Sequence, residues 1–504
     1  MLPEHLKKIK TLGDLKESGY QRQSIKDELR KNLIAALQKQ QPVFPGIIGY
    51  ENTVIPELQN AILARHNILL LGLRGQAKTR IARLMVELLD EWIPIVQGSE
   101  INDDPLFPIS RYARERILEE QEDTPIEWIH RQERYVEKLA TPDVTIADLI
   151  GDIDPIKAAN LKLSFSDERV IHFGLIPRAH RCIFVINEIP DLQPRIQVAL
   201  FNILQEKDIQ IRGFKLRFPL DVQIIFTANP EDYTNRGSII TPLKDRIESQ
   251  ILTHYPKTLT IARKITEQEV RLLPEQKQKV FISALLKDLI EQVAFEARES
   301  EFIDKKSGVS ARLPISALEC LVANAERRIL LNNETSTSAR IADLYAVVPA
   351  ITGKIELVYE GEQEGTLKVA YTLIGKAIRT IFLQRFPDPE KIKKAKKNSP
   401  YQNIINWFNE GNQIELLASY SETQFRSSLY KIKGLEDFIS AHLPELDTPE
   451  KFIYMEFILH GLAECSLIGK KELREGFSFN DVLGSYFNLK NISLEDEDAG
   501  PHFN

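Results

Sequence analysis

The stretch NILLLGLRGQAKTRIARLMVELL, residues 67–89, decides the fold of the first half of this chain. It begins with a short apolar run that predicts a strand, passes through the glycine-containing segment 72–79, and continues as a stretch with helical periodicity. A strand, a glycine loop and a helix in this order form the context of a phosphate-binding P-loop, whose usual pattern is G-x-x-x-x-G-K-S/T. The sequence therefore predicts a phosphate site at the start of this helix.

Each residue type in the loop has a chemical reason. Gly72 and Gly75 allow backbone N–H groups to curl around phosphate oxygens, and the helix start adds further N–H donors. Lys78 is expected to reach the β- and γ-phosphates, and Thr79 to ligate Mg²⁺. The expected nucleotide-binding loop comprises Gly72, Arg74, Gly75, Gln76, Ala77, Lys78 and Thr79.

The loop departs from the usual pattern at Ala77, where glycine is the rule. If this position requires a positive φ, alanine costs about 1 kcal/mol or more. The alternative interpretation is an ordinary strand–turn–helix that binds nothing. The lysine and threonine at the right offset favour the phosphate site.

Two further apolar runs, CIFVINE (182–188) and VQIIFTANP (222–230), also predict strands. Short apolar strands that alternate with helical stretches indicate an α/β fold with a parallel sheet covered on both faces. Ligands of such sheets bind at the carboxyl ends of the strands. All three predicted strands end in polar residues that can serve a nucleotide site.

The second strand ends in Asn187 and Glu188, where a nucleotide-hydrolysing P-loop enzyme normally has Asp–Glu. The glutamate orients or deprotonates the attacking water, so Glu188 is the candidate catalytic base. Asn187 can accept a hydrogen bond from a metal-bound water, but it lacks the charge, and Mg²⁺ binding should be weaker. The alternative is a buried strand that ends at a surface loop.

Three residues further along the chain are candidates for contact with the nucleotide. Asn229, at the end of the third strand, can hold the attacking water or the γ-phosphate, although loop-capping asparagines are common. Arg246 can reach a neighbouring subunit's γ-phosphate, although most such arginines are solvated or salt-bridged. Arg312 precedes a predicted helix, where a cation does not help the helix, so an anionic partner and a surface role both fit.

Taken together, these motifs resemble the AAA+ ATPases of the MoxR and magnesium chelatase subunit I group. The loop GLRGQAKT resembles the MoxR form, which also has Ala-Lys-Thr. The stretch DLIGDIDPIKA…GLIPRAHRCIFVINEIPDLQPRIQVALFNILQEKDIQIRG, residues 148–213, resembles the chelatase segment, and FPGIIGYENTVIPELQNAILA, residues 44–64, resembles the segment that leads into the loop. The resemblance covers roughly residues 44–330.

The resemblance implies a role for each candidate residue. It makes Lys78 and Thr79 the Walker A residues, Asn187 and Glu188 the Walker B residues, and Asn229 sensor one. It places Ile48 and Gly49 at the adenine pocket, Arg246 as a trans arginine finger and Arg312 as the sensor-two arginine. The implied cofactors are ATP and Mg²⁺, and the implied assembly is a homo-oligomer, a hexameric ring, that acts with a von Willebrand factor A domain partner.

The expected fold is a P-loop AAA+ core with a parallel sheet, followed by an all-α lid and helical extensions. We expect an N-terminal helical arm (1–43), the core (44–255) with a helix-two insert (about 151–174), the lid (256–386), a linker (387–400), a C-terminal helical domain (401–490) and an acidic tail (491–504). In the lid, the stretch around 361–365 fits a hairpin or a helix–loop–helix.

Composition limits the remaining possibilities. The 504 residues carry a formal net charge of -7 and only three cysteines, which fits a reducing cytoplasm and argues against nucleic-acid binding. No apolar run approaches the roughly 20 residues of a membrane helix. The expected function is an ATP-hydrolysing ring motor that remodels a partner protein, like a chaperone. The alternatives are a magnesium chelatase motor subunit, a weakly hydrolysing nucleotide-gated scaffold, and a nucleic-acid motor or transcriptional activator.

Overall fold

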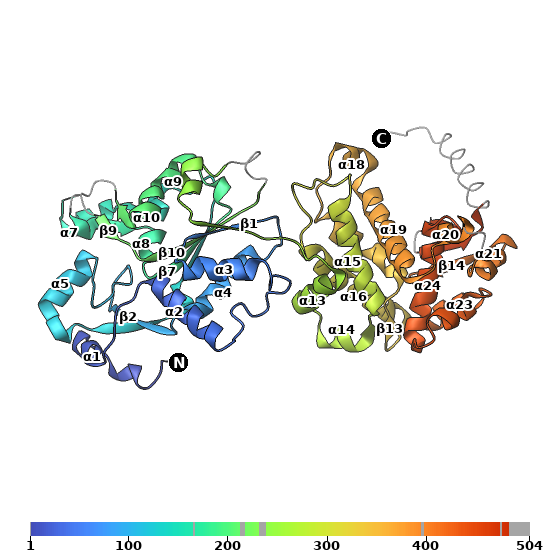
Figure 1. Cartoon of the computed structure of the whole chain (residues 1–504), viewed down its shortest axis with the longest axis horizontal. Helices are drawn as coiled ribbons and strands as arrows, with labels where there is room; N and C mark the ends of the chain where they lie inside the picture. Colours follow the sequence, from blue (N-terminus) through green and yellow to red (C-terminus); the bar gives the residue numbers. More distant parts are fainter. Residues whose placement is uncertain are drawn as a thin grey trace. The chain divides into compact units, whose positions relative to one another are not determined.

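A central parallel sheet organises the first of two structural units, residues Met1–Tyr255 and Pro256–Asn504. The computed structural model describes residues 2–164, 167–211, 217–230, 238–394, 398–473 and 476–482. The predicted acidic tail, 491–504, lies outside the described residues, as does the end of the predicted C-terminal domain. Figure 1 shows the elements of each unit, with colours that follow the sequence.

The sheet of the first unit has the strand order β11-β1-β10-β7-β4, and all of its neighbouring strands are parallel. The structure thereby confirms the predicted sheet and its three predicted strands. The strands are β4 (Tyr135–Leu139), β7 (Cys182–Asn187), β10 (Val222–Ala228), β1 (Ile68–Leu71) and β11 (Ser249–Leu252). Each of β1, β7 and β10 is buried throughout, as their uninterrupted apolar sequence requires.

Apolar side chains cover both faces of this sheet. One face carries Ile68, Val185 and Ile225 and packs against the helices α2, α3 and α4. The opposite face carries Leu69, Phe184 and Phe226 and packs against the helices after β4 and β7. Figure 1 shows α2, α3 and α4 grouped beside the sheet. The helices of this unit are α1 (Leu12–Glu17), α2 (Ile25–Gln38), α3 (Val54–Leu63), α4 (Lys78–Leu84), α5 (Arg111–Glu120), α6 (Ile146–Leu149), α7 (Pro155–Leu161), α8 (Leu175–Arg178), α9 (Pro194–Ala199), α10 (Phe201–Gln205) and α12 (Thr241–Asp245).

Shorter antiparallel pairs surround the sheet. The pairs are β2 (Trp92–Val96) with β3 (Ile126–His130), β5 (Gly151–Ile153) with β6 (Ile171–Phe173), and β8 (Asp208–Gln210) with β9 (Arg217–Pro219). The pair β5–β6 bounds the segment expected as the helix-two insert, and α7 lies between the two strands. The role of that segment stays a prediction.

The local sequence determines where α2 begins and which of its faces is buried. The Ser24 hydroxyl caps α2 by accepting a hydrogen bond from the Asp27 backbone N–H at 3.2 Å. Leu29 and Leu33 on the predicted apolar face are fully buried in the same core as β1 and β7. The N-terminal segment therefore contributes to the packing of the sheet.

The second unit is mainly helical. Its elements are α13 (Leu259–Glu269), α14 (Pro274–Lys279), β12 (Val280–Phe281), α15 (Ala284–Glu299), α16 (Arg312–Asn332), β13 (Thr337–Ser338), α17 (Val348–Thr352), α18 (Tyr359–Glu364), α19 (Thr366–Arg385), α20 (Pro389–Lys394), α21 (Gln402–Asn409), β14 (Ile414–Leu417), α22 (Glu422–Tyr430), α23 (Leu435–His442), α24 (Thr448–Glu464), β15 (Gly469–Leu473) and β16 (Gly476–Asn480). Around Gly365 the chain turns between α18 and α19, so the helix–loop–helix alternative holds there.

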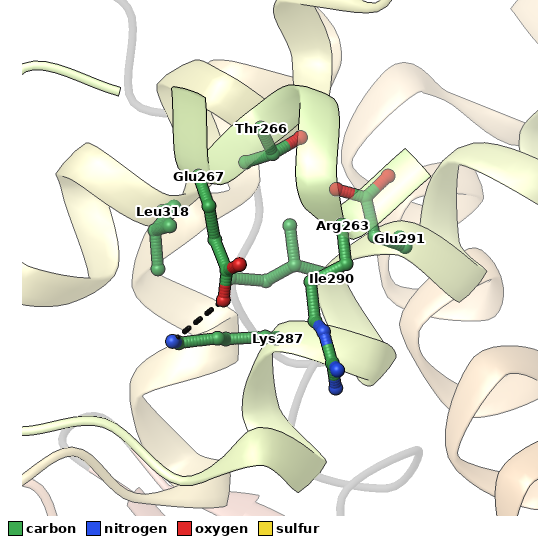
Figure 2. A pocket seen from close by; sticks show the side chains of 7 residues that line it. All are labelled: Arg263, Thr266, Glu267, Lys287, Ile290, Glu291 and Leu318. Atoms are coloured by element: carbon green, nitrogen blue, oxygen red, sulfur yellow. Dashed lines mark hydrogen bonds and ion pairs between the residues drawn. The ribbon is translucent and has the colours of Figure 1, made fainter. Parts of the chain in front are cut away.

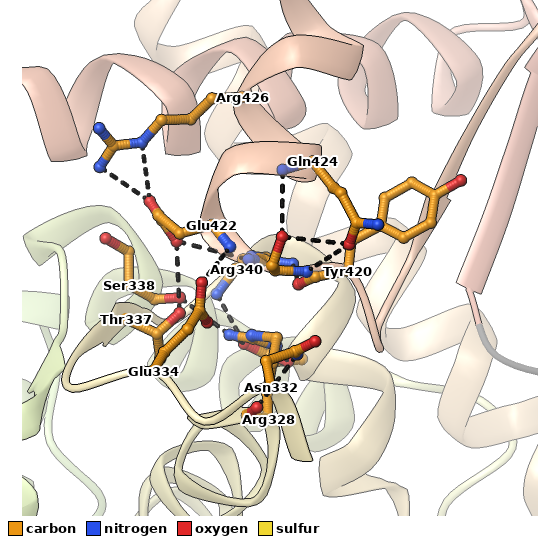
Figure 3. A network of polar contacts seen from close by, with 12 residues as sticks. Arg328, Asn332, Glu334, Thr337, Ser338, Arg340, Tyr420, Glu422, Gln424 and Arg426 are labelled. Atoms are coloured by element: carbon orange, nitrogen blue, oxygen red, sulfur yellow. Dashed lines mark hydrogen bonds and ion pairs between the residues drawn. The ribbon is translucent and has the colours of Figure 1, made fainter. Parts of the chain in front are cut away.

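A single apolar core extends from Val280 to Phe479 through the second unit. Polar contacts join its earlier and later parts: Arg340 donates to the Tyr420 carbonyl at 2.8 Å, and the Glu422 N–H donates to the Glu334 carboxylate at 2.7 Å (Figure 3). A three-stranded antiparallel sheet with the order β14-β16-β15 lies in the C-terminal part, where the sequence analysis expected helices alone. Its strands are only four or five residues long, too short for their period to be recognised in the sequence.

No helix among the described residues has the length and apolarity that crossing a membrane would require.

Candidate nucleotide site

The candidate site forms where β1, β10 and β7 end side by side. Gly72 follows β1, and its N–H donates to the Ala228 carbonyl at the end of β10 at 3.1 Å. Asn229 follows directly, and Asn187 ends the next strand in the sheet. The topology thus brings the three predicted strand ends to one edge of the sheet, as expected for a parallel α/β fold.

The loop between β1 and α4 has the backbone of a phosphate-binding turn. Gly75 has a φ of 74° and Ala77 a φ of 58°, so two residues of the loop adopt the left-handed region. α4 begins at Lys78, and Ala77 at its N-cap makes no side-chain capping bond. A cap of this kind leaves first-turn N–H groups to be satisfied by other means, such as an anion.

Side chains from neighbouring segments brace this loop. The Thr253 hydroxyl donates to the Gln76 side-chain oxygen at 2.7 Å, and the Tyr50 hydroxyl contacts the Gln76 carbonyl at 3.1 Å and the His254 carbonyl at 2.7 Å. Burial raises the pKa of Tyr50 to about 12, so it remains a hydroxyl donor. A Cβ on Gly72 would lie 1.8 Å from the Thr253 hydroxyl oxygen, so this position requires glycine.

Lys78 is the centre of the polar contacts at the sheet edge. It is buried, and its ammonium group donates to the carbonyls of Gly72 and Leu73, the latter at 3.1 Å, and to the Asn229 side-chain oxygen at 2.8 Å. Asn229 in turn donates to the Glu188 carboxylate at 3.3 Å. The structure therefore brings Lys78, Asn229 and Glu188 together in one chain of contacts.

Asn187 and Glu188 occupy distinct environments at the end of β7. The Glu188 backbone has a φ of 54°, a left-handed conformation that is uncommon outside glycine and often marks functional sites. Its N–H donates to the Thr227 hydroxyl at 3.1 Å, and that hydroxyl donates to the Asn187 side-chain oxygen at 3.0 Å. The Asn187 amide nitrogen donates to the Glu137 carboxylate at 2.5 Å.

Other predicted residues lie as follows. Thr79 is in the first turn of α4, and Ile48 and Gly49 lie in the segment before α3, partly exposed. Arg246 follows α12, stacks its guanidinium 4.7 Å from the Phe201 ring centre, and donates to Gln205 at 3.1 Å. Arg312 begins α16 of the second unit and is exposed. Their roles stay predictions.

Sequence reasoning missed Tyr50, Thr227, Thr253 and Glu137. Thr227 had a signal in the sequence, because it is a polar residue inside the apolar run VQIIFTANP. It lies one residue before the end of β10. Glu137 had none, because its strand β4 was not identified. Its side chain reaches Asn187 only through the pairing of β4 with β7.

The arrangement fits Mg²⁺ with a nucleotide. Among the residues that the structure describes, no group of three or more His, Cys, Asp or Glu could hold a metal ion. Mg²⁺ usually binds through one or two protein oxygens together with substrate phosphates and waters, so an all-protein cage is not required. Thr79 and Asn187 are the predicted oxygen donors at this edge.

A pocket lies in the second unit, away from these residues in the sequence. It is lined by Arg263, Thr266, Glu267, Lys287, Ile290, Glu291 and Leu318 (Figure 2). Burial raises the pKa of Glu291 in this pocket to about 7, against the effect of a hydrogen bond from Thr266. Lys287 forms an ion pair with Glu267 at 2.8 Å (Figure 2).

Comparison with known proteins supports the fold. Residues 126–247 match the family model for the AAA domain of the dynein-related subfamily. The matched segment includes Asn187, Glu188, Asn229 and Arg246, whereas the loop 72–79 precedes it. The first unit therefore has the predicted α/β fold of an AAA+ core, and helical extensions follow it. No curated protein matches the chain.

Several solved structures share a general likeness. The complex of BchI and BchD of magnesium chelatase is 19% identical, with 64% of this chain and 99% of that chain covered and a TM-score of 0.33. Hsp104 with ATPγS and FITC casein is 14% identical over 61% of this chain and 50% of that chain, with a TM-score of 0.36. NtrX from Brucella abortus is 14% identical over 72% of this chain and 70% of that chain, with a TM-score of 0.36. At these TM-scores the likenesses carry no argument about function.

Proposed function

We propose that this chain binds ATP with Mg²⁺ at the edge of the first unit's sheet and hydrolyses it. The observation that carries the proposal is the chain of contacts from Lys78 through Asn229 to Glu188, at the ends of three neighbouring strands. A buried ammonium group and a carboxylate are thereby held beside a loop with left-handed backbone at two positions. That combination suits a polyphosphate and an attacking water.

Each residue has a role in this proposal. Lys78 holds the β- and γ-phosphates, and the backbone N–H groups of the loop surround them. Thr79 and the Asn187 side chain support Mg²⁺, which supplies charge neutralisation on the phosphates when it is bound. Glu188 orients or deprotonates the attacking water, and Asn229 holds both Lys78 and Glu188 in position.

We further propose that the chain works as a homo-oligomeric ring of MoxR type, with a hexamer as the expected size. Arg246 would act on the nucleotide of a neighbouring subunit, and Arg312 on its own from the predicted lid. A ring of this kind would remodel or activate a partner protein, with a von Willebrand factor A domain as the expected partner. The resemblance of residues 44–330 supports these assignments.

A second function is favoured by one specific observation, the amide at Asn187 where hydrolysing enzymes have a carboxylate. In that case the chain is a nucleotide-gated scaffold that binds ATP and turns it over slowly. The two functions share the binding site and differ in turnover.

Binding of a fluorescent ATP analogue to the purified full chain tests the shared part of the proposal. We expect saturable binding in the wild type and a loss of at least about 10-fold in affinity for Lys78→Ala, since charge-assisted contacts to phosphate contribute about 1.5–3 kcal/mol each. Lys138→Ala, in the edge strand β4, is the matched control and should bind as the wild type does. Equal binding by Lys78→Ala and the wild type would contradict the proposed site.

A further inference from the structure

Glu137, in the middle of β4, contacts the position that usually carries the metal-supporting carboxylate. One carboxylate oxygen accepts the Asn187 amide N–H at 2.5 Å. The other oxygen accepts from the Tyr135 hydroxyl at 3.1 Å and from the Arg83 guanidinium at 2.9 and 3.1 Å. The Glu137 side chain is 23% exposed and the Arg83 side chain 64%.

The strand register places Glu137 on the face of the sheet that α4 covers. Leu139 pairs with Asn187, and Glu137 pairs with Val185, which packs against that helix face. Residues two apart in a strand share a face, so Glu137 and Asn187 point to the same side. Arg83, which holds Glu137, lies one helical turn after Thr79 on α4. The carboxylate thus stands between the strand end and the helix that carries Thr79.

The Asn187 amide is oriented by partners that differ in kind. An ionised carboxylate can only accept hydrogen bonds, so the nitrogen of the Asn187 amide must face Glu137. The Asn187 oxygen then faces the Thr227 hydroxyl, which donates to it at 3.0 Å. This orientation lets Asn187 fix the position of the Glu137 carboxylate.

The pair Asn187–Glu137 contains a single negative charge. If residue 187 were an aspartate, two carboxylates would meet at hydrogen-bond distance, and like charges that close cannot both ionise readily. An amide at 187 and an acid at 137 together carry the charge that one aspartate would carry at 187 alone. The substitution at the strand end therefore has a partner on the neighbouring strand.

We propose that Glu137 supplies the Mg²⁺ site with the negative charge that the Asn187 side chain lacks. In this arrangement the Asn187 amide is the hydrogen-bond donor that positions the Glu137 carboxylate. Glu137 is a positioning residue, which would act on the metal from outside its ligands. Arg83 opposes this charge, because its guanidinium shares the same carboxylate. The inference rests on the proposed ATP site, and it favours turnover over a slow scaffold.

The test measures how much Mg²⁺ half-saturates the binding of a fluorescent ATP analogue to the full chain. Glu137→Gln should raise this concentration by about 10- to 100-fold, the usual effect of removing a partner just outside the metal's ligands. Binding of the analogue without metal should not weaken, because the change removes a negative charge near the phosphates. Arg83→Met should shift the Mg²⁺ requirement in the opposite direction, because it removes a competing cation and leaves the carboxylate.

A charge swap separates the electrostatic role from a structural one. In the double variant Asn187→Asp/Glu137→Gln the carboxylate and the amide exchange places, so the single charge and the hydrogen bond are both kept. We expect its Mg²⁺ requirement to return toward that of the wild type. Thermal unfolding of each variant identifies any that fails to fold, and the swap and Arg83→Met then carry the test.

Two outcomes distinguish the inference from the function on which it rests. If the wild type binds the analogue in a Mg²⁺-dependent way but Glu137→Gln has the same requirement, the inference is wrong and the ATP site stands. The inference is also wrong, and the ATP site again stands, if Arg83→Met weakens Mg²⁺ binding as Glu137→Gln does. If the wild type binds no analogue with or without Mg²⁺, the proposed function itself fails.

Discussion

At the scale of single residues, Ala77 shows strain at the candidate site. Its φ of 58° lies in the left-handed region, which a side chain makes unfavourable. Ala77→Gly should therefore raise the free energy of unfolding by about 1 kcal/mol, because glycine adopts this conformation without the Cβ contact. Denaturant unfolding, followed at the transition of the first unit, measures the change in the free energy of unfolding.

The matched control is Ala35→Gly in the interior of α2, where the backbone is helical. There glycine should lower the stability by about 0.5–1 kcal/mol. Opposite signs for the two substitutions are the expected result. A destabilisation of similar size at both positions would contradict the left-handed conformation of Ala77.

The candidate site was partly predictable from the sequence at this scale. Spacing alone singled out Lys78, and the rule that parallel strands end at one edge brought Glu188 and Asn229 into its neighbourhood. Glu137 and Thr253 could not be found this way, because both reach the site through strand pairing between distant segments. The spacing of residues in a motif carries no information about such partners.

At the scale of elements, a buried ion pair joins α2 to the end of η4 (Arg131–Arg134). Both Glu28 oxygens accept from the Arg134 guanidinium, at 2.7 and 2.6 Å, and both side chains are almost completely buried. Glu28→Ala should destabilise the first unit by about 3–5 kcal/mol, since it leaves the Arg134 charge buried without its partner. Denaturant unfolding measures the loss.

The exposed pair Lys16–Glu122, at 3.3 Å, provides the comparison. Glu122→Ala should change the stability by less than about 1 kcal/mol, because water screens an exposed pair. If Glu28→Ala were as mild as Glu122→Ala, α2 would not be an integral part of the first unit.

In the second unit, α13 and α15 enclose Glu291 in the pocket of Figure 2. Burial raises its pKa from 4.5 to about 7. Between pH 4.5 and pH 7 the folded protein therefore keeps a proton on Glu291 that the unfolded chain has released. The stability from this proton is complete below pH 4.5 and is lost as the pH rises through 7. Glu291→Gln stays neutral and should not show this loss.

Thermal unfolding of the second unit between pH 5 and pH 8 measures the difference. The midpoint of Glu291→Gln should rise relative to the wild type as the pH increases, by at least about 2 °C over this range. A difference between the two midpoints that is the same at pH 5 and pH 8 would argue against a protonated Glu291.

The elements also show what the sequence predicts well. The strands β1, β7 and β10 are apolar throughout and fully buried, so their sequence alone identifies them. β4 has the mixed sequence YVEKL and is only partly buried at the edge of the sheet, and β14, β15 and β16 are short. Edge and short strands carry weak patterns, because fewer of their positions face a core.

At the scale of the whole molecule, the proposed ATPase would share its site between neighbouring subunits of a ring. In a head-to-tail ring every interface joins two different surfaces, so a residue such as Arg246 would act on the neighbour's nucleotide. Lys78→Ala and Arg246→Ala then damage opposite sides of the same interface. Each variant alone should lose ATP hydrolysis, Arg246→Ala by about 10³-fold or more.

The most direct test is steady-state ATP hydrolysis with Mg²⁺ by the wild type, by each variant, and by an equal mixture of the two. In mixed rings, an Arg246→Ala subunit keeps its Lys78 and can receive the intact Arg246 of a Lys78→Ala neighbour. Such interfaces should form about a quarter of the total in random rings, so the mixture should regain measurable hydrolysis. Adding Glu188→Gln to the Arg246→Ala subunit should abolish the recovery. A wild type that hydrolyses no ATP, or a mixture as inactive as its components, would contradict the shared-site ATPase.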